Sequence, residues 1–570
     1  MKVAERRRLT AVARGAAPAD LYVRGGTLLN VYTGELYPAN VAVHGERVAY
    51  VGARDDMVGA RTTVLDAGGR VLVPGYVDPH VHPAHVITPS ALARHVLALG
   101  TTTLFADTLQ FWELGGVRAF TAVADALARS PVKFYWMIRP HAQSRTTDEA
   151  RRFPLRDLAR ALAHPSAVAA GEVTRWPEVH AGDPDLLARL DLALARGQRV
   201  EGHTAGASVE RLAAIAAGGL SSDHEPITAR EVLDRARLGI AVMLRESSLR
   251  PDLSDLLDAL KEAPGLAARA MLTADGSMPA FVLEHGFVDH LIRTAMQRGV
   301  PPLDAYRMAT LNPATYFGKD ADLGGIAPGR YADICLLRDL SEPRPETVVA
   351  RGRVAAREGR TLVPIPEPSW RRVFSTPAAR LTARWRARAA DFRLPGRATF
   401  PVLRLVSAVI TKVEERAPQP GDLHAALVDR RGRWVAPALV AGFADRLDGL
   451  ASTISTDFNI LTLGRRPESM ARAVNRLLEV RGGVVLVDGD DVAWELPLPL
   501  GGIMTRAELP EAARHERELS RHLTERGSSF HEPFFTMLFL SADFLPAARL
   551  TPLGVWDVKA ARVLLPSRRR

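Results

Sequence analysis

The sequence predicts an α/β protein built around a TIM-like (β/α)8 barrel, and three observations carry that prediction. Short runs of β-branched and aliphatic residues alternate with helix-like segments through residues 74–323. This alternation is typical of a parallel sheet, and about eight units in about 250 residues match the size of such a barrel. Polar residues follow nearly every predicted strand, at the face where these barrels place their active sites.

The predicted barrel strands can be read in order along the chain. They are VLVPGYVDPHVH, GTTTLFAD, VKFYWMIRP, AVAAGEV, QRVEGHT, LSSDHEP, IAVMLRES and RAMLTADG. Helical periodicity between them predicts helices within residues 89–100, 185–197 and 208–219.

Two further domains are predicted around the barrel. Residues 1–73 and 324–365 both alternate short β-rich runs with turn residues, so they are expected to fold together as a small β-sandwich domain. The barrel at residues 74–323 would then be inserted between them. A Pro- and Arg-rich linker follows at residues 362–377, and residues 378–570 are expected to form a separate C-terminal α/β domain.

Composition and charge exclude several classes of protein. The 570 residues are 47% hydrophobic and 24% charged, as in soluble globular proteins. Cys335 is the single cysteine, which excludes a disulfide framework and any four-cysteine zinc site. The sequence has no signal peptide and no run long enough to span a bilayer, so we expect a cytoplasmic protein without a membrane partner.

A formal net charge of +10 raises the question of a nucleic-acid partner. The basic clusters lie at residues 6–8, 380–388 and 568–570, at the termini and near the expected linker. No recognisable nucleic-acid-binding module surrounds them. A solvated basic surface is therefore the favoured interpretation, and nucleic acid is not expected as a partner.

Four histidines predict a metal site at the C-terminal face of the barrel. His80 and His82 are two apart on a strand, so both side chains point to the same side. Alone, His203 or His224 could equally be a hydrogen-bonded buried histidine, but together at successive strand ends they are better explained as ligands. His85 lies beyond Pro83, and we expect a loop histidine that points away from the site.

Two carboxylates complete the predicted site. Two-metal sites of this kind often bridge their ions with a carbamylated lysine, but no lysine lies between Lys133 and Lys261. If two ions bind, Glu172 is placed to bridge them. Asp275 ends the last predicted strand and suits both metal binding and proton transfer.

The chemistry of this ligand set predicts hydrolysis. Mixed nitrogen and oxygen ligation with open positions suits one or two ions of Zn²⁺, Mn²⁺ or Fe²⁺. A metal-activated hydroxide would attack the substrate, Asp275 would accept its proton and pass it to the leaving group, and His224 would stabilise the developing charge. The expected reaction is hydrolysis at a C–N bond, either deamination or opening of a cyclic amide.

Several stretches carry a resemblance to a known family. VPGYVDPHVH, AAGEV, VEGHTAGAS, SSDHEPIT and MATLNPATYFGKDADLGGIAPGRYADICLL resemble the amidohydrolase superfamily, and adenine deaminases most of all. ELPLPLGGIMT and EPFFTMLFLSADFLPAARLTPLGVWDV are similar to the C-terminal domain of that family. The resemblance implies a metal-dependent hydrolase of purine metabolism that converts adenine and water into hypoxanthine and ammonia. It assigns metal binding and proton transfer to His80, His82, Glu172, His203, His224 and Asp275.

The chain departs from the family pattern at three places. Pro83-Ala84-His85-Val86 stands where Ile-Glu-Ser-Ser is usual, and Leu109-Gln110 stands where the family has His-Glu. Ser455 to Phe458 lie within a segment where His-Asp-Ser-His is usual. These changes indicate a divergent branch. Another purine, a cyclic amide or a different N-heterocycle therefore stays open as the substrate, and so does an inactive binding homologue. The number of ions and the assembly into homo-oligomers also stay open.

Overall fold

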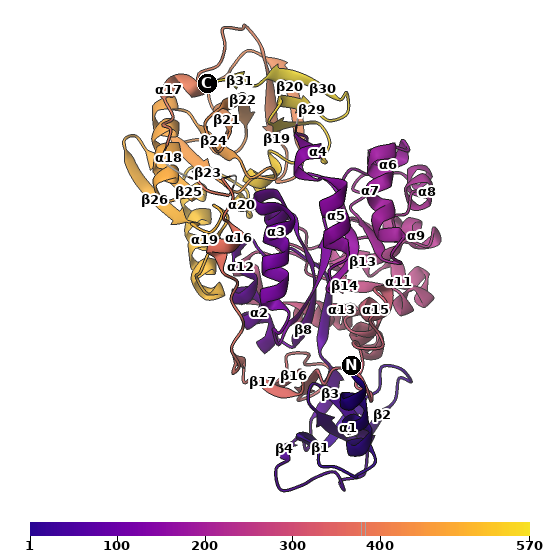
Figure 1. The fold of residues 1–570 in the computed structure, drawn as a ribbon. Coiled ribbons are helices and arrows are strands. Elements are labelled where there is room, and N and C mark those ends of the chain that lie inside the picture. The colour runs from indigo at the N-terminus through magenta and orange to yellow at the C-terminus, as the bar shows by residue number, and fades with distance from the viewer. Residues whose placement is uncertain (147, 378, 382–383) are drawn as a thin grey trace.

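The computed structural model describes residues 1–146, 148–377, 379–381 and 384–570. Position 378, where the C-terminal domain was expected to begin, and two positions of the basic cluster at 380–388 lie outside the described residues. Figure 1 shows the barrel in the middle, with a small β layer at one end and the C-terminal region at the other. Among the described residues, no helix is long and apolar enough to cross a membrane.

The predicted barrel is confirmed. Eight parallel strands follow one another in chain order within one sheet. Their bounds are β6 (Tyr76–Val81), β8 (Thr101–Asp107), β9 (Lys133–Ile138), β10 (Ala167–Val173), β11 (Arg199–Gly202), β12 (Ser222–Asp223), β13 (Ala241–Arg245) and β14 (Met271–Thr273). A parallel bridge between Val81 and Asp275 joins the last strand region to the first. Three expected site residues therefore lie at this seam, because Asp275 forms the bridge and His80 and His82 flank Val81.

Helices cover the outside of the barrel (Figure 1). Each of the three segments expected to be helical contains a helix. A further helix, α3, begins directly after β8. The principal bounds are α2 (Pro89–Ala98), α3 (Leu109–Leu127), α5 (Leu155–Leu162), α7 (Pro184–Leu194), α8 (Val209–Ala217), α9 (Ala229–Arg237), α12 (Pro279–His285) and α13 (Val288–Gln297). Thr88 and Asp183 cap two of them by accepting hydrogen bonds from the first turn, which explains where those helices begin.

The first expected barrel strand is divided between two sheets. Val71–Pro74 form β5, which pairs with β15 (Ile334–Leu337) in the small β layer, and β6 begins after Gly75. A Cβ at position 75 would lie 2.3 Å from Thr102 Oγ1, so only glycine permits this close approach. Sequence periodicity does not reveal the division because the two halves form one continuous run of extended residues, and only their pairing partners differ.

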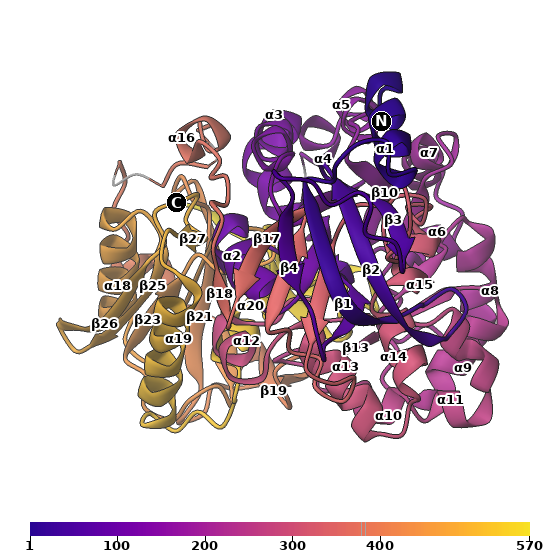
Figure 2. The same ribbon diagram turned by 90° about the horizontal axis from the view of Figure 1, so that it is seen from below.

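Two distant segments form the small β layer. Its strands β1 to β5 come from the N-terminal segment and β15 to β18 follow the barrel, all in one nine-stranded sheet. The remaining bounds are β1 (Leu21–Leu29), β2 (Leu36–His44), β3 (Arg47–Gly52), β4 (Thr63–Asp66), β16 (Thr347–Ala350), β17 (Arg353–Arg357) and β18 (Arg360–Thr361). Figure 2 shows strands of both segments in one layer seen from below, and in the order of the sheet β16, β15 and β5 lie between β17 and β1.

The C-terminal region contains a second nine-stranded sheet. Its strands are β19 (Phe400–Leu405), β20 (Thr411–Arg416), β21 (Leu423–Val428), β22 (Trp434–Ala441), β23 (Gly449–Ser452), β24 (Ile460–Gly464), β25 (Gly483–Asp488), β26 (Asp491–Pro497) and β31 (Arg568–Arg569). Helix α18 (Pro467–Glu479) packs on this sheet. A separate three-stranded sheet consists of β28 (Ala548–Thr551), β29 (Gly554–Asp557) and β30 (Arg562–Pro566).

Strand β27 (Met504–Thr505) and helix α19 (Leu509–Thr524) are among the elements that join the C-terminal region to the barrel. Strand β27 pairs in parallel with β7 (Val86–Ile87), just beyond the paired histidines. Helix α19 packs against α12, with α20 (Pro533–Phe539) beside it. The Glu516 carboxyl group of α19 accepts a hydrogen bond of 2.8 Å from Ala280 N–H in the first turn of α12. Burial, with repulsion from Glu532, raises the pKa of Glu516 to about 8.

This raised pKa predicts that Glu516 makes stability depend on pH. Between its usual value of 4.5 and about 8, the unfolded chain loses the Glu516 proton while the folded protein keeps it. Stability therefore falls as pH rises through that window and levels off above it. We expect the Glu516→Gln variant to gain stability over the wild type between pH 5 and pH 8, on the order of a few kcal/mol. Urea unfolding at both pH values measures this gain.

The exposed Glu511 of the same helix provides the matched control. Glu511→Gln should leave the difference between pH 5 and pH 8 as in the wild type. A Glu516→Gln variant with the wild-type pH dependence would contradict the assignment.

Candidate metal centre

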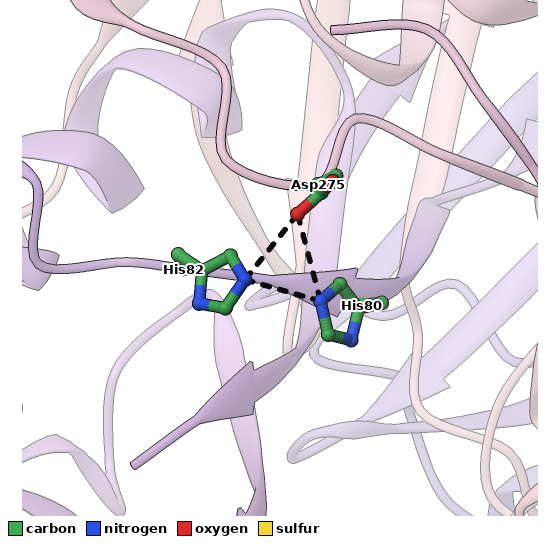
Figure 3. A group of neighbouring side chains, drawn as sticks. All are labelled: His80, His82 and Asp275. Carbon is green, nitrogen blue, oxygen red and sulfur yellow. Dashed lines mark hydrogen bonds and ion pairs between the residues drawn. The ribbon is translucent and has the colours of Figure 1, made fainter. Parts of the chain in front are cut away.

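The first group of candidate ligands lies at the seam of the barrel. His80 and His82 are at the end of β6, and Asp275 follows β14. The Nε2 atoms of the two histidines are 3.3 Å apart, and Asp275 Oδ1 lies 3.5 Å from His80 Nε2 and 3.3 Å from His82 Nε2. Figure 3 shows these three side chains pointing toward one another. One cation could therefore contact all three.

A second group lies beside the first. Glu172 at the end of β10 places Oε1 2.5 Å from His203 Nδ1 and 3.6 Å from His224 Nε2. Its other oxygen, Oε2, lies 3.7 Å from His82 Nε2. Glu172 thus lies between the two groups, as expected for a bridging carboxylate. The structure brings together all six residues that the sequence pointed to.

A buried ion network holds Glu172 in place. Arg139, at the end of β9, is fully buried and forms ion pairs with both Asp107 and Glu172. Its Nε lies 2.9 Å from Asp107 Oδ1. Although burial alone would raise the pKa of Glu172, the Arg139 charge and His203 hold it well below its usual range. Glu172 is therefore an ionised carboxylate between the two groups of candidate ligands.

The electrostatics of the centre fit a metal ion. Despite burial, Asp107 and Asp275 raise the pKa of His82 to about 10, and carboxylates raise that of His224 well above its usual value. A site this rich in negative charge retains positive charge, as protons on imidazoles or as a divalent cation. His203 Nε2 is buried and has no hydrogen-bond partner among the described residues. Imidazole and carboxylate together form a donor set that suits divalent transition metals.

A cavity of about 120 Å³ opens above these ligands. Residues of the barrel line one side, and residues of the C-terminal region line the other. The Phe544 ring contacts the His203 ring edge to face, with centroids 5.0 Å apart. The C-terminal region therefore contributes directly to the environment of the candidate metal centre.

The expectation that His85 points away from the site is wrong. Its ring stacks on His82 with centroids 5.4 Å apart and lines the same cavity. Val86 has a φ of 64°, and β7 is paired with β27, so the backbone turns this side chain inward. Burial and the neighbouring His82 lower the pKa of His85 to about 3, which makes it a neutral imidazole.

Comparisons with known proteins agree with this architecture. The amidohydrolase family profile matches residues 71–355, and the profile of the adenine deaminase C-terminal domain matches residues 406–562. The chain is 36% identical to an adenine deaminase of Methylobacterium nodulans, with 98% of this chain and 100% of that protein covered. The chain belongs to the adenine deaminase family.

Two other adenine deaminases are similar to this chain over nearly their whole length. An adenine deaminase of Rubrobacter xylanophilus is 35% identical, with 97% of this chain and 95% of that protein covered. One of Moorella thermoacetica is 34% identical, with coverages of 97% and 96%. Proteins of the amidohydrolase family are generally metal-dependent, as the candidate ligand groups would require.

Sequence reasoning missed two buried carboxylates of this amidohydrolase centre. Glu201 Oε1 lies 2.8 Å from His224 Nδ1, and Oε2 lies 3.6 Å from His80 Nδ1. Asp78 accepts hydrogen bonds from Thr273 Oγ1 and the backbone of Ala274, so it ties β6 to β14 at the seam. The alternation Asp78–His80–His82 and Glu201–His203 could have revealed both, since residues two apart share a face of a strand.

The contact between Glu201 and His224 predicts a role in metal affinity. A carboxylate that accepts a hydrogen bond from Nδ1–H keeps the ring proton on Nδ1 and leaves Nε2 free to bind a metal. Losing such a partner weakens metal binding by about 10- to 100-fold. We expect the Glu201→Gln variant to show a loss in that range without unfolding. Chelator competition followed by elemental analysis measures it.

Exposed Glu210 on α8 provides the control, because Glu210→Gln should bind metal as the wild type does. Unchanged metal affinity in Glu201→Gln would show that the hydrogen bond to His224 has no such role.

Proposed function

We propose that this protein is a metal-dependent aminohydrolase that converts adenine and water into hypoxanthine and ammonia. The observation that carries the proposal is the arrangement of two ligand groups around Glu172, below a cavity in a chain of the adenine deaminase family. The residues that would hold one or two ions of Mn²⁺, Fe²⁺ or Zn²⁺ are His80, His82, Glu172, His203, His224 and Asp275.

A divalent cation in this site would supply Lewis acidity and lower the pKa of water from about 15.7 to about 7. The protein would contribute the base. Although burial alone would raise the pKa of Asp275, His80 and His82 hold it well below its usual range, so the carboxylate is ionised. Asp275 can therefore accept a proton from the attacking water and return it to the departing amine. Arg245 Nη1, 3.5 Å from Asp275 Oδ2, helps to orient this carboxylate.

His224 would act opposite Asp275 in the same reaction. Its Nδ1 is hydrogen-bonded to Glu201, which fixes the ring and directs Nε2 toward Glu172 Oε1 at 3.6 Å. When Nε2 carries a proton instead of holding a metal ion, the fixed imidazolium would stabilise negative charge as it develops on the substrate ring. Apolar side chains line part of the cavity, and with a substrate bound they would limit the access of competing water.

Substitutions of Asp275 and His80 test the proposed mechanism. We expect purified, metal-loaded protein to release ammonia and hypoxanthine from adenine, and Asp275→Asn to lower kcat by at least about 10³-fold by removing the proton acceptor. His80→Ala should lose bound metal and activity together. Ammonia release, elemental analysis and circular dichroism measure the three properties.

Exposed side chains that lie outside the site provide matched controls. Asp320→Asn and His180→Ala should retain wild-type turnover and metal content. Wild-type protein that binds no transition metal, or an Asp275→Asn variant of full activity, would refute the proposed mechanism.

A second candidate keeps the reaction but changes the substrate to another purine or a cyclic amide. The specific observation is that all three departures from the family pattern line the cavity, including Gln110, Ser455 and Phe458. Steady-state assays of adenine against a panel of purines and cyclic amides separate the two candidates. Preference for a panel member over adenine would favour the second, whereas turnover of none would leave a binding homologue.

A further inference from the structure

The cavity above the metal centre has an apolar wall from the C-terminal region. Phe535 and Phe539 of α20, Phe544 and Ile454 line it, and Phe535 lies edge to face with His85 at 5.9 Å. At about 120 Å³ the cavity has room for on the order of ten water-sized groups, which fits a small bicyclic heterocycle. Aromatic side chains favour a flat ring between them.

Most polar side chains that line the cavity already form hydrogen bonds or ion pairs within the protein. Arg139, Gln143 and Arg245 belong to ion pairs or hydrogen bonds beneath the cavity. Ser247, Ser455 and Thr456 bond to neighbouring backbone or hydroxyl groups. Arg250 pairs with Asp252, and Glu225 with Arg245. Outside the six candidate ligands, the polar lining residues without a side-chain hydrogen bond to any described residue are Gln110 and His85.

Gln110 is buried but has no hydrogen bond to its amide. It lies in the first turn of α3, only 2% exposed, and its Oε1 has no partner among the described residues. It follows Asp107, whose Oδ1 accepts a hydrogen bond of 3.1 Å from Leu109 N–H and whose Oδ2 lies 3.1 Å from His82 Nδ1. Gln110 is therefore held close to the metal centre. A buried amide without a partner is rare unless a ligand satisfies it.

His85 is the second such group. Its Nδ1 is buried without a hydrogen-bond partner in the described part of the chain. The ring is held between His82, on which it stacks, and Phe535. Val86, in the left-handed region at a φ of 64°, is strained for a β-branched residue, and such strain is typical of functional sites.

Building on the proposed function, we propose that Gln110 and His85 are the specificity-determining residues that recognise the substrate. Together they select a neutral, planar N-heterocycle that offers both an N–H donor and a ring-nitrogen acceptor. The amide presents one acceptor and two donors, and the unpartnered Nδ1 of His85 presents one further polar atom. The Gln110 amide is uncharged and surrounded by an apolar wall, so it favours an edge without a phosphate or ammonium group.

Binding of hypoxanthine, the product, tests this without turnover. Calorimetry on metal-loaded protein compares the wild type with Gln110→Met, which keeps the shape but removes the amide, and with His85→Ala. We expect each change to raise Kd about tenfold, the loss of one buried hydrogen bond. His85→Asn restores a polar group near the Nδ1 position and should bind within about threefold of the wild type. For adenine turnover, KM should rise in parallel while kcat changes less than about threefold.

Metal content and matched controls complete the experiment. Metal content should stay at the wild-type level in every variant, and exposed Gln297→Ala and His180→Ala should bind hypoxanthine normally. Wild-type affinity in both Gln110→Met and His85→Ala would overturn the inference, as would loss of metal from His85→Ala.

The outcome separates this inference from the function on which it rests. If the wild type deaminates adenine but the variants bind hypoxanthine normally, only the recognition role fails. If the wild type binds hypoxanthine without deaminating adenine, the proposed function fails, and the affinities of the variants still decide the recognition role. If the wild type does neither, both fail.

Discussion

The ion network of Arg139 with Asp107 and Glu172 is the interaction on which the centre depends. All three side chains are buried, and an unpaired charge in such a place would be strongly destabilising. Because each comes from the end of a neighbouring strand, β8, β9 and β10, the network also fixes how these strands meet. It keeps Glu172 ionised between two groups of imidazoles and places Asp107 beside His82 Nδ1. Both consequences are needed for a site that attracts divalent cations.

The C-terminal region completes the cavity whose other lining residues come from the barrel. A bare barrel face would expose the ligand groups to bulk water, where charge–charge interactions are weak. Helix α20 and Phe544 cover them with aromatic side chains, and the pairing of β27 with β7 fixes the turn that brings His85 inward. The same polypeptide that closes the cavity therefore also shapes the surface that meets a substrate.

Much of the fold was predictable because parallel strands impose a simple rule. All their carboxyl ends lie at one face, so polar residues after successive apolar runs must gather there. This is why residues as far apart as His80 and Asp275 could be placed in one site from sequence alone. The division at Gly75 was not predictable, because β5 and β6 form one continuous run of extended residues and only their pairing partners differ. Glu201 was predictable in principle, because it stands two residues before His203 and therefore shares a face of the strand with it.

The sequence by itself determined the barrel, the chemistry of the ligands and the strand ends that carry them, since these follow from local periodicity and residue type. Only the tertiary structure decided that Glu172 lies between two ligand groups and that His85 and Gln110 face the cavity. Phe535, more than 400 residues from His85 along the chain, lies against its ring. Such contacts depend on how separate domains pack, and no local pattern encodes the distance between them.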